Sequence, residues 1–114
     1  MVEMWTYRTA VMVEPSVDLS DFAVEANDGS IGKISESTAD AGKSYVVVDT
    51  GPWIFGKEVV LPAQTIDRID LDARVVYIDR TKEEIKNAPE LDPARGVDAS
   101  YQDELTSYYR GFYA

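Results

Sequence analysis

Six short segments between residues 22 and 79 have the composition of β-strands, and turn-forming residues separate them. Several alternate between apolar and polar residues, as expected where one face of a strand packs and the other meets solvent. No stretch between them is long enough for the helical crossover that parallel strands need. The sequence therefore predicts a mainly β fold: a small, highly curved antiparallel β-barrel of about six strands. The segments are FAVEA, SIGKISEST, SYVVVDT, EVVLP, TIDRID and RVVYID.

Helical signals begin after the last of these segments. Thr81 followed by Glu84 has the spacing of a capping box, so we expect a short helix there, stopped by Pro89. A second helix is expected from about Ser100. These changes divide the chain into an N-terminal extension (residues 1–20), a barrel domain (21–89), and a linker with an amphipathic C-terminal helix (90–114).

Aromatic residues recur at helical spacing in this C-terminal tail. Tyr101, Leu105, Tyr108 and Phe112 are separated by four, three and four residues, which places them on one face of a helix. Two interpretations are open. The face packs on the barrel, or it contacts a partner or a second copy of the chain. Tyr109 lies off this stripe, which favours the second interpretation slightly.

The residues that the chain lacks exclude several functions. It has no cysteine and no histidine, which excludes disulfides, thiolate metal sites, and Ser-His or Cys-His catalysis. The formal net charge of −10 opposes direct binding to nucleic acid or to an anionic membrane surface. The N-terminus does not have the pattern of a signal peptide, and no run approaches the roughly 20 apolar residues of a membrane span. We therefore expect a cytoplasmic protein.

The stretch TGPWIFGKEVV, residues 50–60, contains the G-x-x-x-x-G-K spacing of a phosphate-binding P-loop. A P-loop needs a helix after it and a Ser or Thr after the lysine. Here Glu58 follows the lysine, and the next residues are typical of a strand. The sequence therefore predicts a loop between two barrel strands. Trp53 and Phe55 in that loop either cover the open mouth of the barrel or form a contact patch for a partner.

Acidic residues gather near the turn between the last two predicted strands. Asp67, Asp70 and Asp72 do not have the spacing of a calcium-binding EF-hand loop. Asp70 and Asp72 are typical turn residues whose side chains bond nearby backbone N–H groups, and Asp67 is expected to face solvent. The sequence therefore predicts no metal site here.

Three parts of the sequence resemble the PRC-barrel domain family: FAVEANDGSIGKISE, YVVVDTGPWIFGKEVVLPAQTIDRID and VVYIDRTKEEIKNAPE. The resemblance covers about residues 20–90. The same domain occurs in the H subunit of photosynthetic reaction centres and in RimM-type ribosome-maturation factors. The resemblance implies a strongly bent antiparallel barrel that serves as an interaction module in a small stand-alone bacterial protein. It implies no catalytic residues and no common cofactor.

The leading hypothesis is a non-catalytic protein-interaction or assembly module that self-associates as a homodimer or higher homo-oligomer through open strand edges or aromatic surfaces. One alternative is a module that binds a small ligand or acts in a stress response. Another is an accessory factor for ribosome or RNA assembly that acts through protein contacts. The partner is not identified by the sequence, and no cofactor is expected. The candidate interface residues are Trp53, Phe55, Tyr101, Leu105, Tyr108, Tyr109 and Phe112.

Overall fold

A computed structural model describes residues 4–8, 18–38, 44–51, 58–92 and 94–113. The predicted six strands and two helices are confirmed. Their bounds are β1 Ala23–Ala26, β2 Gly29–Ser37, β3 Tyr45–Asp49, β4 Glu58–Pro62, β5 Ile66–Asp70, β6 Val75–Ile78, α1 Lys82–Lys86 and α2 Ala99–Arg110.

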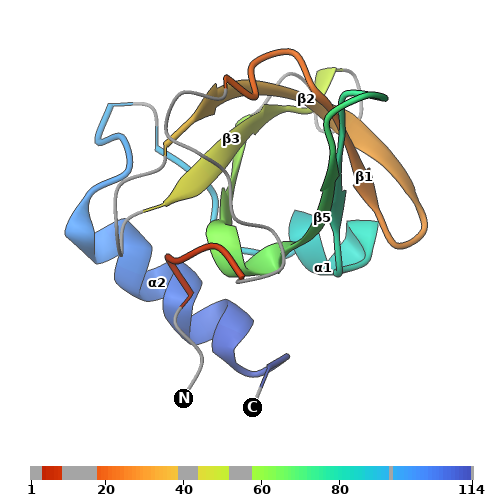
Figure 1. The fold of residues 1–114 in the computed structure, drawn as a ribbon. Coiled ribbons are helices and arrows are strands. Elements are labelled where there is room, and N and C mark those ends of the chain that lie inside the picture. Colours follow the sequence, from red (N-terminus) through yellow and green to blue (C-terminus); the bar gives the residue numbers. More distant parts are fainter. Residues whose placement is uncertain (1–3, 9–17, 39–43, 52–57, 93, 114) are drawn as a thin grey trace.

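The strands form one strongly curved sheet in the order β4-β3-β2-β1-β6-β5 (Figure 1). Neighbouring strands are antiparallel except β1 and β6, which run parallel, with Ala23 opposite Val75. The prediction of an antiparallel barrel is therefore correct for four of the five pairs. The parallel pair arises because the chain curls round until its last strand lies beside its first. The consecutive strands β4 and β5 lie at the two ends of the sheet, joined by a 3₁₀ turn at Ala63–Thr65.

Two of the three register shifts in the described sheet lie where β2 pairs with its neighbours. The register shifts between Val24 and Glu25 in the β1–β2 pair and between Ile34 and Glu36 in the β2–β3 pair. Such bulges bend a strand and increase its twist. Between them lies Gly32, whose φ is +147°. A Cβ at this position would stand 2.1 Å from the backbone oxygen of Asp49, so only glycine allows β2 to approach the end of β3 this closely.

The hydrophobic core is one cluster to which every part of the described chain contributes. It includes Met4 and Trp5 from the N-terminal segment, Ile85 from α1, and Leu105 from α2, in addition to strand residues. The Trp5 carbonyl accepts the Ser44 N–H, at 2.8 Å, so the N-terminal segment is also tied to the sheet by backbone hydrogen bonds. Among the described residues, no helix is long and apolar enough to cross a membrane.

Helix α1 begins where the sequence predicted. The Thr81 hydroxyl accepts the Glu84 backbone N–H at 3.1 Å, and the Glu84 carboxylate accepts the Thr81 N–H at 2.9 Å. The capping box is therefore confirmed in both of its hydrogen bonds.

Candidate protein-interaction surfaces

The aromatic face of α2 divides into a buried part and an accessible part. Tyr101, Leu105 and Tyr109 are buried in the core, whereas Tyr108 is half-buried and Phe112 is 37% exposed. The structure therefore brings Tyr101, Leu105 and Tyr109 together on the face that packs against the rest of the protein. Tyr108 and Phe112 keep surface that a partner could reach. Trp53 and Phe55, the other two predicted contact residues, lie outside the described residues.

Polar atoms at the tips of aromatic side chains anchor α2. The Tyr101 hydroxyl donates to the Pro89 carbonyl at 2.9 Å, and the Tyr108 hydroxyl donates to the Glu84 carbonyl at 2.6 Å. The indole N–H of Trp5 donates to the Thr106 hydroxyl at 2.8 Å. The Tyr109 hydroxyl is the exception: it is the one buried side-chain polar atom, among the described residues, without a hydrogen-bond partner.

Burial raises the pKa of the tyrosines that hold α2 in place. It raises the pKa of Tyr101 to about 12, with smaller contributions from the nearby carboxylates of Glu104 and Glu90. Burial also raises the pKa of Tyr109 and Tyr113 well above the ordinary value of 10.0. The folded protein therefore keeps protons on these hydroxyls at pH values where an unfolded chain loses them.

We expect the protein to lose stability as pH rises from about 10 to 12. Because the folded-state pKa of Tyr101 is raised, the unfolded chain binds fewer protons in this interval, so each increase in pH favours unfolding. The stabilising effect is complete below pH 10 and is lost towards pH 12. Denaturant unfolding at a series of pH values, with tyrosinate absorbance in the same samples, measures this. Tyr101→Phe should make the decline shallower. Titration of all tyrosines near pH 10 in the folded protein would contradict the expectation.

Residues from both ends of the described chain meet at the end of β6. The Asp79 carboxylate accepts hydrogen bonds from the guanidinium of Arg8 and the hydroxyl of Tyr113, both at 2.5 Å. The Arg80 guanidinium lies 4.8 Å from the centre of the Phe112 ring and 4.9 Å from that of Tyr113. The Arg80 guanidinium thus makes cation–π contacts with the exposed Phe112 ring and with the Tyr113 ring.

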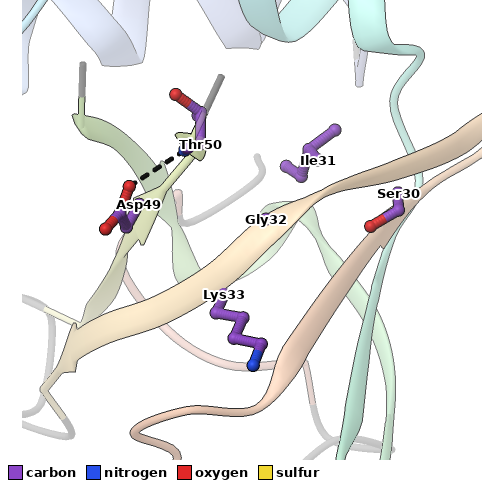
Figure 2. A pocket seen from close by; sticks show the side chains of 7 residues that line it. Ser30, Ile31, Gly32, Lys33, Asp49 and Thr50 are labelled. Atoms are coloured by element: carbon purple, nitrogen blue, oxygen red, sulfur yellow. Dashed lines mark hydrogen bonds between the residues drawn. The ribbon is translucent and has the colours of Figure 1, made fainter. Parts of the chain in front are cut away.

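A hollow of about 390 Å³ lies where Gly32 brings β2 against the end of β3. Its lining consists of Ser30–Lys33 and Asp49–Gly51, and Figure 2 shows Ile31 and Lys33 extending to opposite sides of β2. The Asp49 carboxylate accepts the Gly51 N–H at 2.9 Å, as expected of an aspartate at the start of a turn. Among the described residues, no group of three or more acidic side chains could hold a metal ion.

The P-loop-like stretch and the turn at Asp70 are both followed by strands, β4 and β6 respectively. The P-loop-like stretch leads into strand β4 rather than into a helix, so the helix N-terminus that a phosphate site needs is absent at Glu58–Pro62. Asp70 accepts the Ala73 N–H at 3.0 Å, which confirms its predicted role in the turn. The side chain of Asp67 is 61% exposed, which confirms that it faces solvent.

The two ends of the sheet differ in how they are covered. Beside β4, Glu58 and Val59 share a small cavity of about 40 Å³ with the segment from Ala88 to Leu91 that follows α1. Beside β5, Asp67 and Arg68 are both exposed, and Leu71 in the following turn is 56% exposed. Neither Arg68 nor Leu71 belongs to a sequence pattern that predicts a contact, although adjacent charged residues in a short strand are typical of an edge position.

Comparison with known proteins identifies the class of domain that this architecture defines. The family model of the PRC-barrel domain matches residues 16–85, which include all six strands and the beginning of α1. The chain therefore belongs to the PRC-barrel family, and the resemblance noted from the sequence is confirmed.

Ten chains of solved structures match. One is the crystal structure of a 16S ribosomal RNA processing protein, RimM, from Pseudomonas aeruginosa, with 22% sequence identity and a TM-score of 0.48. The match covers 57% of this chain and 42% of that chain, so this chain spans less than half the length of that protein. None of the curated proteins compared with the chain matches it.

Proposed function

We propose that this PRC-barrel module is non-catalytic, that it binds other proteins, and that it associates with copies of itself. The observation that carries the proposal is the accessible end of the sheet at β5. Among the described residues this strand pairs with no strand other than β6, although the Ile66 N–H at its start bonds to the Ala63 carbonyl of the preceding turn. Exposed strand edges are templates for the addition of a further strand.

The side chains around this edge have the composition of a protein contact. Leu71 is the most exposed large apolar residue in the described part of the chain, and Arg68 lies over the Tyr77 ring. Tyrosine and arginine are enriched among the residues that contribute most to protein–protein binding. Tyr108 and Phe112 are proposed as a second, smaller contact at the end of α2.

The charge of the chain narrows the class of partner. A net charge of −10 opposes binding to polyanions, so the partner is a protein rather than a nucleic acid. The lack of histidine and cysteine removes the commonest nucleophile and base combinations. Together these features support a binding module over an enzyme.

We expect the purified protein to form dimers reversibly as its concentration rises. Light scattering and sedimentation over a range of concentrations should show the mass increasing from 12.7 kDa towards twice that value. The control is the same series in strong denaturant, where only the monomer mass is expected. A mass that stays at the monomer value at every concentration under native conditions would refute self-association.

A further inference from the structure

One carboxylate holds both the N-terminal strap (residues 4–8) and the end of α2. Asp79 accepts hydrogen bonds from the Arg8 guanidinium and from the Tyr113 hydroxyl. We propose, independently of self-association, that these groups form a clasp that couples the two ends of the described chain. Movement of Tyr113 away from Asp79 would loosen the strap, and movement of Arg8 would loosen the end of α2.

The strap crosses the turn between β4 and β5. The Met4 carbonyl accepts the Gln64 N–H, and the Thr6 carbonyl accepts the Gln64 side-chain amide, both at 3.0 Å. The Trp5 carbonyl accepts the Ser44 N–H at 2.8 Å. Figure 1 shows the strap, in red, between α2 and the 3₁₀ turn. The backbone of the strap is therefore bonded both at the start of β3 and at the connection between the two ends of the sheet.

Arg8 extends the hold of the strap to the last two strands. Its Nε donates to the Gln64 carbonyl at 2.9 Å, one terminal nitrogen lies 3.2 Å from Asp67, and the other donates to Asp79 at 2.5 Å. The side chain of Asp79 is 25% exposed and that of Asp67 is 61% exposed. Solvent and salt screen an exposed ion pair more than a partly buried one. Asp79 is therefore the stronger of the two carboxylate anchors of Arg8.

Tyr113 shares this anchor with Arg8. The Tyr113 hydroxyl donates to one oxygen of Asp79, and Arg8 donates to the other. The Arg8 guanidinium also lies 5.7 Å from the centre of the Tyr113 ring. Departure of Tyr113 would remove a hydrogen bond that orients the Asp79 carboxylate and the ring against which Arg8 lies. Groups that share one network in this way do not act independently.

Phe112 is the accessible part of this arrangement. It immediately precedes Tyr113, its side chain is exposed, and its ring lies against Arg80. A partner that binds Phe112 would thus act one residue away from the clasp. Release of the strap would then leave the Ser44 and Gln64 N–H groups without their present acceptors. The contact at Phe112 belongs to the proposed function, whereas the coupling between the two ends does not depend on it.

Amide hydrogen exchange of the full chain, followed by NMR, tests the coupling in both directions. Tyr113→Phe removes only a hydroxyl at the C-terminal side. It should nevertheless speed exchange of the Ser44 and Gln64 N–H groups, which report on the strap, by at least about threefold. Arg8→Gln changes only the strap. It should speed exchange of the Phe112 N–H, which bonds to the last turn of α2, by a similar factor.

Removal of the shared anchor provides a second test. Asp79→Ala should speed exchange at both Ser44 and Phe112. When Tyr113→Phe is added to Asp79→Ala, the Ser44 rate should change by less than about twofold, because the acceptor of the hydroxyl is already gone. Full additivity of the two substitutions would show that Tyr113 does not act through Asp79 and would overturn the clasp.

A matched variant and a reference amide separate coupling from a general loss of stability. Tyr108→Phe also removes a hydroxyl from α2, one that bonds to the Glu84 carbonyl, so it should leave exchange at Ser44 unchanged. The Ile34 N–H, bonded to the Phe22 carbonyl at 2.9 Å, reports on the sheet and should keep its wild-type rate in every variant.

Two results would refute the coupling. In Tyr113→Phe, exchange at Ser44 and Gln64 could stay at the wild-type rate, or it could speed up no more than exchange at Ile34. Either result would mean that the two ends are held separately. The oligomeric state is measured in different experiments, so failure of self-association and failure of the clasp are distinguishable.

Discussion

Replacing Gly32 with alanine is expected to lower the free energy of unfolding by more than about 3 kcal/mol. The new Cβ would lie 2.1 Å from the backbone oxygen of Asp49 and 2.9 Å from its backbone carbon. Neither neighbour is a flexible side-chain end, so relief requires β2 and β3 to separate. Denaturant unfolding monitored by tryptophan fluorescence or circular dichroism measures the loss.

Two other glycines provide the matched control for this substitution. Gly51 and Gly96 also have positive φ, +57° and +68°, but a Cβ at either position would have no neighbour within 4 Å. Gly51→Ala and Gly96→Ala should therefore show the backbone penalty alone, about 1–2 kcal/mol. If Gly32→Ala destabilises the protein no more than these two, the close approach of β2 to Asp49 is wrong.

Replacing Tyr109 with alanine is expected to cost about 3–5 kcal/mol, the range found when large buried aromatic residues are truncated. Tyr109 is fully buried, and its ring lies 5.0 Å from Tyr108 and 6.3 Å from Phe112, measured between ring centres. Truncation leaves a cavity at the contact between α2 and the rest of the core. Thermal and denaturant unfolding measure the effect.

Tyr109→Phe separates packing from hydrogen bonding at the same position. The hydroxyl is buried and makes no hydrogen bond to the described residues, so its removal should leave stability unchanged or raise it by about 1 kcal/mol. Tyr101→Phe is the comparison, because the Tyr101 hydroxyl donates to the Pro89 carbonyl. That variant should lose about 1 kcal/mol. A loss of that size in Tyr109→Phe would show that its hydroxyl has a partner.

Features encoded by neighbouring residues could be predicted from the sequence. The capping box at Thr81 and Glu84 depends on two residues three apart, and it forms as expected. The strands likewise follow from local alternation and from turns such as the one in which Asp70 takes part. In each case the residues that carry the signal also make the contact.

Features that depend on distant segments could not be predicted in this way. Nothing local in β1 or β6 indicates that Ala23 lies opposite Val75 in a parallel pair. The register is set by how far the whole sheet curls. Nor does the N-terminal segment show by itself that Trp5 packs in the core, because its hydrogen-bond partner Thr106 is 101 residues away.

The aromatic face of α2 shows an intermediate case. Spacing grouped Tyr108 with Tyr101 and Leu105, whereas the structure buries Tyr109 with these two and leaves Tyr108 half-buried. Tyrosine has an apolar ring and a polar tip, so it suits a buried face and a surface alike. The sequence therefore located the helix, but the orientation of the helix about its axis depends on the surface that it meets.

The parallel pair of β1 and β6 also determines when the protein can fold. β1 cannot gain its second neighbour until the chain has been synthesised through Val75–Ile78, and Trp5 must wait longer still for α2. Contacts between residues so far apart in the chain slow the search for the native state. A nascent chain ending before β6 would expose β1 along one side, and exposed strands of this kind promote aggregation. Trp5 therefore reaches its native hydrogen-bond partner only after α2 has been synthesised.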